Sequence, residues 1–251
     1  MQDDFRDEQR HYWEKADAAH FRWQTTAPYI ARSEAALLDD LRLEAGERLL
    51  EIGCGEGGNL HHVAARHPTA KLYGTDFSPA KAAFAHRATG ALTACADATA
   101  LPLADAAFDA VLIRDLLHHV LPALRGRVLT EARRVLRPGG RLFLIEPNGR
   151  SPLVLLQACT VRAERGALAS TRARLEAELE AAGLVDVTIG ARQPLPLSRV
   201  LLHPQMGAPG LGGLTPVAWA LERIERAADV LPTVLWTYLV CQGRRPDVQE
   251  T

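Results

Sequence analysis

The sequence predicts an α/β fold of the Rossmann-like type, in which helices cover both faces of a mostly parallel sheet. Two observations support this prediction. From Arg48 onward, short apolar runs alternate with segments of helical period, a pattern typical of parallel strands joined by crossover helices. A glycine-rich turn at residues 53–58 follows the first run, where a strand commonly leads into a helix beside a ligand.

The apolar runs predict seven strands. Each run is bounded by turn or helix-start residues, as expected for buried strands. The expected strands are residues 48–52, 71–75, 92–96, 108–113, 141–146, 185–191 and 234–241. Between the fourth and fifth strands, Leu124, Val128, Ala132 and Val135 fall on one helical face. We expect Pro138-Gly139-Gly140 to end that helix.

The chain is expected to comprise an N-terminal helical cap, residues 1–43, and a main domain, residues 44–251, with an insertion at about residues 193–230. The insertion is too long for a plain connection. It is therefore interpreted as a substrate lid, with a surface excursion as the open alternative. The cap is rich in aromatic residues, which helix packing and a substrate pocket explain equally well. These are Tyr12, Trp13, Phe21, Trp23 and Tyr29.

Composition and cysteine spacing argue against several classes of function. The formal net charge of −1 shows no bias toward polyanions, so no nucleic-acid partner is expected. No segment reaches the ~18 apolar residues of a membrane span, and the first residues lack the features of a secretory signal, which predicts a cytoplasmic location. The cysteines lie far apart without nearby histidines, so neither a disulfide framework nor a metal site is expected. The sequence does not indicate an oligomeric state.

The glycine turn is compatible with two kinds of cofactor. Free N–H groups and the dipole at the following helix start favour an anionic group, either a pyrophosphate or an amino-acid carboxylate. Gly53, Gly55 and Gly58 satisfy the dinucleotide pattern G-x-G-x-x-G, and Asp76 lies about 20 residues further on. An NAD(P)-dependent oxidoreductase is therefore a competing hypothesis. Glu51 argues against it, because an acid beside the turn would repel a pyrophosphate and suit an ammonium group.

The motifs that follow the turn resemble, in order and spacing, those of class I S-adenosylmethionine-dependent methyltransferases, and of type-11-like small-molecule methyltransferases in particular. They are Gly74-Thr75-Asp76-Phe77-Ser78-Pro79, residues 96–103, Phe108-Asp109-Ala110-Val111 and Leu136-Arg137-Pro138-Gly139-Gly140. The resemblance covers about residues 30–150. It implies S-adenosyl-L-methionine as the cofactor and a seven-stranded sheet whose last strand runs antiparallel.

The resemblance also implies which residues hold the methionine part of the cofactor. The backbone of the loop formed by Gly53, Cys54, Gly55 and Gly57 would surround it, with Glu51 near the ammonium group.

Further residues are implied for the rest of the cofactor. Asp76 would accept both ribose hydroxyls, and Phe77 would lie against the adenine. Asp97 would accept from the adenine amino group, while the N–H of Ala98 would donate to the ring. The backbone of Arg114 would contribute to the methionine end.

The segment after the fourth strand is the expected place for a general base. His118 or His119 would take this role where the acceptor must lose a proton. In the open alternative, one histidine packs against the cofactor, a role assigned here to His119, and the other faces solvent. Metal binding by this pair with Asp115 is not expected. The protein's main contribution would be alignment, because the cofactor already supplies a good leaving group.

The predicted function is S-adenosylmethionine-dependent methyl transfer to a small-molecule acceptor, with oxygen favoured over nitrogen or carbon as the accepting atom. The apolar segment at residues 151–159 suits an apolar or aromatic acceptor, and it fits a buried helix equally well. Besides the oxidoreductase, a catalytically silent protein that keeps the cofactor site remains an alternative.

Overall fold

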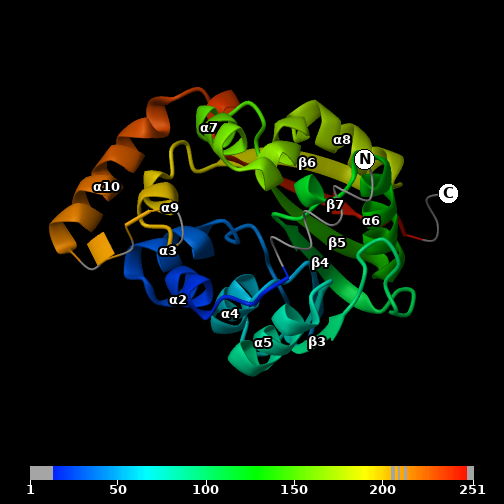
Figure 1. The fold of residues 1–251 in the computed structure, drawn as a ribbon. Coiled ribbons are helices and arrows are strands. Elements are labelled where there is room, and N and C mark those ends of the chain that lie inside the picture. Colours follow the sequence, from blue (N-terminus) through cyan, green and yellow to red (C-terminus); the bar gives the residue numbers. More distant parts are fainter. Residues whose placement is uncertain (1–13, 205–206, 209, 212–213, 248–251) are drawn as a thin grey trace.

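The computed structural model of the chain describes residues 14–204, 207–208, 210–211 and 214–247. Its strands form one seven-stranded sheet in the order β3-β2-β1-β4-β5-β7-β6 (Figure 1). The strands are β1 (Arg48–Ile52), β2 (Lys71–Asp76), β3 (Leu92–Cys95), β4 (Phe108–Arg114), β5 (Leu136–Pro147), β6 (Val185–Arg192) and β7 (Tyr238–Arg244). Strand β7 runs antiparallel to both neighbours, and all other pairs are parallel. The predicted fold class is therefore confirmed.

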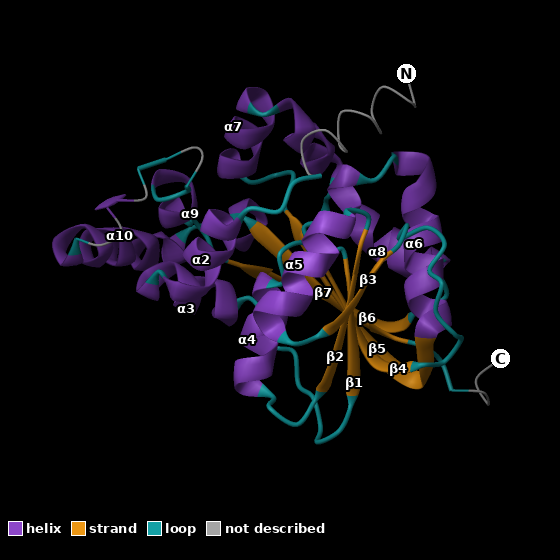
Figure 2. Cartoon of the chain, turned by 60° about the horizontal axis from the view of Figure 1, so that its bottom comes forward, coloured by secondary structure: helices purple, strands orange, loops and turns teal. Residues whose placement is uncertain are grey.

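Helices flank this sheet on both faces. Figure 2 shows α4 and α5 on one side of the strands and α6 and α8 on the other. The α-helices are α2 (Ala18–Thr26), α3 (Pro28–Ala36), α4 (Gly58–Arg66), α5 (Pro79–Thr89), α6 (Pro122–Val135), α7 (Pro152–Thr160), α8 (Arg172–Ala181), α9 (Leu197–Leu201) and α10 (Thr215–Ala227). Short 3₁₀ segments are η1 (Leu117–His119), η2 (Arg162–Ala169), η4 (Ala228–Val230) and η5 (Thr233–Leu235). In the described part of the chain, no helix has the length and apolar character needed to cross a membrane.

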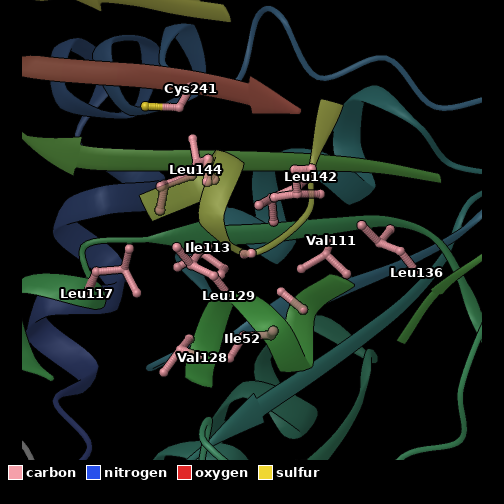
Figure 3. Packing of buried hydrophobic residues seen from close by; sticks show 14 of the residues in the cluster. Ile52, Val111, Ile113, Leu117, Val128, Leu129, Leu136, Leu142, Leu144 and Cys241 are labelled. Carbon is pink, nitrogen blue, oxygen red and sulfur yellow. The ribbon is translucent and has the colours of Figure 1, made fainter. Parts of the chain in front are cut away.

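Strand alternation divides the core into two layers. Successive side chains of a strand point to opposite faces of the sheet. Val111 and Ile113 therefore pack toward α6 and α8 (Figure 3), whereas Ala110 and Leu112 pack toward the end of α3 and toward α4. Both faces are buried, which explains why the central strands are continuous apolar runs.

Most strand boundaries agree with the sequence prediction to within one residue, and the larger differences occur at β5 and β7. Helix α6 ends at Val135 as expected, but Pro138-Gly139-Gly140 belongs to β5 as an irregular stretch, because Leu136 already pairs with Phe108. The last strand begins at Tyr238 rather than four residues earlier. A 3₁₀ turn occupies residues 233–235, and the Trp236 indole N–H donates to the Leu231 carbonyl at 2.9 Å. Local hydrogen bonding thus overrides the apolar pattern there.

The cap helices and the insertion pack against each other at one end of the sheet (Figure 1). Trp23 of α2 and Ile30 of α3 form a buried cluster with Leu202, next to α9, and Leu221 of α10. Asp17 begins α2 by accepting hydrogen bonds from two backbone N–H groups of its first turn. Of the predicted aromatic residues, Tyr12 and Trp13 lie outside the described residues. The division into a cap and a main domain with a lid stays a prediction.

Candidate functional site

A cavity of about 780 Å³ lies where β1, β2, β4 and β5 end. Strand β1 lies between β2 and β4, so strands β2 and β3 extend the sheet on one side of β1 and β4 and β5 extend it on the other. The order of the strands reverses at this position, and a crevice opens at the carboxyl ends of the strands there. Loops from these strands form the floor, while α2, α7 and α9 contribute the walls. The volume falls within the range of about 300–1,000 Å³ typical of small-molecule sites.

The glycine turn after β1 reaches the cavity through Gly53, Cys54 and Gly55. Gly53 has φ 76°, and a Cβ there would lie 3.0 Å from the Leu116 side chain. Gly57, with φ 85°, precedes α4 and does not line the cavity. A side chain at Gly53 would be both strained and crowded, so this turn requires glycine at that position.

Asp76 lies at the end of β2 and faces the turn. Its two carboxylate oxygens accept from the N–H groups of Gly55 and Ser78, each at 2.9 Å. Burial raises the pKa of Asp76. Both Asp76 and the partly exposed Phe77 line the cavity, next to each other.

Asp97 and Ala98 line the same end of the cavity, after β3. One oxygen of Asp97 accepts from the N–H and the hydroxyl of Thr99, at 2.8 and 2.7 Å. This local turn holds the carboxylate in place beside Cys95 and Ala96, which also line the cavity. The two acidic residues predicted to contact ribose and adenine are thus brought together, and their roles in binding stay predictions.

Glu51 lies beneath the cavity instead of lining it. Its side chain is fully buried, and the Asn59 amide donates to it at 2.6 Å. Asn59 does line the cavity, so its side-chain amide lies between the carboxylate of Glu51 and the cavity. The expected contact of Glu51 with an ammonium group stays a prediction. Burial raises the pKa of Glu51 to about 8.

Replacing Glu51 with glutamine is expected to change the pH dependence of stability. The folded pKa of about 8 exceeds the ordinary value of 4.5, so the folded protein holds a proton that the unfolded chain releases between these values. The free energy of unfolding of the unmodified protein should fall as pH rises through this window. The Glu51→Gln variant has no carboxyl group at this position, so its free energy of unfolding should not fall for this reason. Urea unfolding at about pH 5 and about pH 8 measures the difference. The exposed Glu180→Gln serves as the control, and parallel pH profiles of Glu51→Gln and the parent would contradict the prediction.

Glu56 attaches the cap to the glycine turn. Its carboxylate accepts from the Asp17 N–H at 3.0 Å and lies 3.4 Å from the Lys81 ammonium and 3.6 Å from the His20 ring. Burial alone would raise the pKa of Glu56, but His20 and Lys81 outweigh it and lower the pKa to about 2. Helix α2 is therefore held over the cavity by a buried carboxylate.

A second carboxylate joins the cap, the sheet and the insertion. Glu34 of α3 binds the guanidinium of Arg114 at 2.6 Å and that of Arg199 at 2.6 Å. Arg114 also donates to the Asn59 side chain at 2.7 Å. Burial alone would raise the pKa of Glu34, but the two guanidinium groups hold it below its usual range. The prediction for Arg114 concerned its backbone; the structure adds that its side chain connects three elements.

His118 is enclosed by two carboxylates. Its Nδ1 lies 2.9 Å from Glu146, and its Nε2 lies 3.5 Å from Glu164. Glu146 also accepts from the N–H groups of Leu116 and Leu117, at 2.9 and 2.7 Å. Burial alone would lower the pKa of His118, but the carboxylates raise it to about 10. In the absence of a bound ion, His118 therefore holds a proton more firmly than a free imidazole does and is poorly suited to accept another.

His119 has the opposite character. Burial and the neighbouring His118 charge lower the pKa of His119 to about 3. The two ring centroids are 3.8 Å apart, and Nε2 of His119 lies 3.9 Å from Glu164. Both imidazoles line the cavity; His118 is buried, whereas the side chain of His119 is 15% exposed. The base role of either residue stays a prediction.

Helix α7 forms the apolar wall beside the histidines. Leu153, Val154 and Gln157 line the cavity, whereas Leu155 and Leu156 are 51% and 59% exposed. The segment is thus a wall with one solvent-facing side, and the alternative of a simple buried helix is wrong.

Sequence reasoning missed four residues of this site: Glu34, Asn59, Glu164 and Arg199. A usable signal existed for Glu34, which lies four residues after Ile30 and four before Leu38, on the buried face of its helix. No local pattern identified Glu164 or Arg199, since their partners are far away in the sequence.

Comparison with known proteins agrees with this geometry. Residues 50–144 match the family model described as a methyltransferase domain. A demethylmenaquinone methyltransferase of Beutenbergia cavernae is 41% identical over 112 residues, covering 44% of this chain and 45% of that protein. The 27-O-demethylrifamycin SV methyltransferase of Amycolatopsis mediterranei is 35% identical over 144 residues, covering 51% of this chain and 52% of the relative.

Among solved structures, the phosphoethanolamine N-methyltransferase 2 of Haemonchus contortus in complex with S-adenosyl-L-methionine has a similar fold. It superposes with a TM-score of 0.68 at 19% identity, covering 97% of this chain and 60% of that protein. The chain spans about half the length of the curated relatives that it matches. The matched segment, residues 50–144, includes the glycine turn, Asp76 and Asp97, and over this segment the chain is similar to class I S-adenosylmethionine-dependent methyltransferases.

Proposed function

We propose that the chain transfers a methyl group from S-adenosyl-L-methionine to a small-molecule acceptor, with oxygen favoured as the accepting atom. One observation carries the proposal. A single cavity runs from Asp76 and Asp97 to His119 and the apolar wall of α7, so cofactor and acceptor can occupy it together. Two relatives are named for small-molecule acceptors, and one name specifies an oxygen.

The cavity suits this cofactor at both of its polar ends. The glycine turn offers a backbone cradle that a side chain at Gly53 would fill. Asp76 is positioned by two backbone N–H groups, as a receptor for a vicinal diol should be. Phe77 would lie against the adenine, with Asp97 and the Ala98 N–H at its edge. Asn59, supported by Glu51, would replace Glu51 as the contact for the ammonium group.

The protein's contribution to the reaction would be mainly alignment. When bound, the cofactor supplies an electrophilic methyl group on a good leaving group. Holding the two reacting atoms in line can supply about 7–11 kcal/mol of the barrier. Of the two histidines, only His119 is neutral and able to take the acceptor proton. Its low pKa makes it a weak base, so base catalysis would be the smaller contribution.

The cap and the insertion would cover the reacting end. Helices α2 and α9 both line the cavity, and they are joined through Glu34 and the cluster around Trp23. Excluding water there would strengthen the polar contacts that align the reactants. This is the proposed role of residues 1–43 and 193–230.

Calorimetry with S-adenosylhomocysteine tests the proposal first. We expect one molecule to bind per chain, and no heat from NADH under the same conditions. Incubation with methyl-labelled cofactor and a metabolite extract should then transfer label to a small molecule. Binding without transfer of label to any acceptor would favour the catalytically silent alternative. Failure of S-adenosylhomocysteine to bind would refute the proposed function.

A further inference from the structure

We propose that His118, His119 and Glu164 bind one divalent transition-metal ion of the Zn²⁺ type at the acceptor end of the cavity. Metal binding as such does not depend on methyl transfer. The further role of the ion, which is to bind the acceptor oxygen, rests on the proposed function.

The spacing of the three side chains is close to that of a metal site. Each offers one ligand atom, and these atoms all lie within 4.8 Å of one another. Nε2 of His118 and Nε2 of His119 lie 3.5 and 3.9 Å from the two oxygens of Glu164. Ligands placed about 2.0–2.1 Å from a tetrahedral Zn²⁺ lie roughly 3.3–3.5 Å apart. The cluster would therefore have to close around the ion to complete the arrangement.

The imidazole of His118 is also held from outside the cluster. Nδ1 of His118 lies 2.9 Å from Glu146, a carboxylate that is itself fixed by the N–H groups of Leu116 and Leu117. Histidines that bind metal usually have such an orienting partner, which fixes the ring and its tautomer. Glu146 therefore directs Nε2 of His118 toward Glu164.

The backbone also brings the two halves of the cluster together. His118 and His119 belong to η1, after β4, whereas Glu164 belongs to η2. A Cβ at Gly166 of η2 would lie 1.8 Å from the His118 carbonyl oxygen. Only glycine allows this approach, so η2 lies directly against η1 and Glu164 is held at a set distance from the histidines.

The type of ion and its open position follow from the ligands. Two imidazoles and one carboxylate suit Zn²⁺, Fe²⁺ or Ni²⁺ better than Mg²⁺ or Ca²⁺, which prefer oxygen ligands. Three protein ligands leave a fourth position, as in catalytic zinc sites. All three residues line the cavity next to Leu153 and Val154, so the fourth ligand would come from the cavity. The acceptor class is therefore an apolar molecule that presents a hydroxyl or enol oxygen.

An ion-pair cluster without metal is the competing explanation, with protonated His118 held between Glu146 and Glu164. To separate the two, the full chain is treated with a chelator and dialysed against Zn²⁺, and bound zinc is measured by mass spectrometry. We expect one zinc ion per chain. Glu164→Gln and His119→Ala should each weaken zinc binding by about 100-fold or more. His203→Gln is the matched control, because His203 lines the same cavity outside the cluster and should leave zinc binding unchanged.

Calorimetry with S-adenosylhomocysteine on every variant shows whether the fold and the cofactor end are intact. Parent protein that takes up no zinc, or Glu164→Gln that binds zinc as the parent does, would overturn the metal site. Should Glu164→Gln fail to fold, His119→Ala alone decides, since His119 is partly exposed at the cavity. Zinc uptake without S-adenosylhomocysteine binding would leave the metal site standing and refute the proposed function instead.

Discussion

Replacing Glu34 with alanine is expected to lower the free energy of unfolding by about 3–5 kcal/mol. Glu34 is 1% exposed and pairs with Arg114 and Arg199, both at 2.6 Å. Its removal would leave two guanidinium groups without their shared carboxylate, one of them buried in the sheet. The loss is large because the charges that remain have been taken out of water. Urea denaturation of the purified chain measures it.

The matched control is Asp39→Ala, which removes another carboxylate from the turn after α3. Asp39 pairs with Arg66 at 2.8 Å, but its side chain is 57% exposed, so the expected loss is within about 1 kcal/mol. Equal losses for Glu34→Ala and Asp39→Ala would show that the buried triad does not hold the cap and the insertion to the sheet. Glu34→Ala should also weaken protection of α9 from proteolysis more than that of α6.

Replacing Asp76 with alanine is expected to raise the dissociation constant for S-adenosylhomocysteine by about 100-fold or more. A hydrogen bond to a charged group contributes about 1.5–3 kcal/mol, and a carboxylate on a diol makes two. The change also removes the acceptor for the Gly55 N–H, which loosens the turn that would hold the methionine part. Calorimetry on the parent and the variant gives both constants.

Asp105→Ala provides the comparison for this measurement. Asp105 is exposed, pairs with Arg134 and does not line the cavity, so its loss should leave the affinity unchanged. An unchanged affinity for Asp76→Ala would place the ribose elsewhere. Asp97→Ala would then identify whether the neighbouring acid receives it.

The element boundaries illustrate where sequence patterns lose accuracy. Strand β1 coincides with the predicted residues 48–52, because the apolar run and the glycine turn define both of its ends. The last strand does not, since Val234 and Leu235 continue the apolar pattern while the backbone makes a 3₁₀ turn stabilised by Trp236. A short apolar run does not by itself distinguish a turn from a strand, and Val234 is in fact 50% exposed.

The sequence by itself determined the fold class and the order of the motifs, and the family resemblance of those motifs implied the type of cofactor. These depend on short-range features: apolar runs of strand length, glycines with positive φ and acids at strand ends, each readable within a few residues. The glycine turn and the acids at strand ends lie at one edge of the sheet because the carboxyl ends of parallel strands meet there.

The tertiary structure alone decided which side chains meet around the cavity. Glu164 reaches His118, Arg199 reaches Glu34, and Asn59 comes between Glu51 and the cavity. Two of these three contacts join residues that are far apart in the chain, and no local spacing encodes them. Such contacts form only when distant parts of the chain pack together, which is the physical reason that they could not be predicted from the sequence.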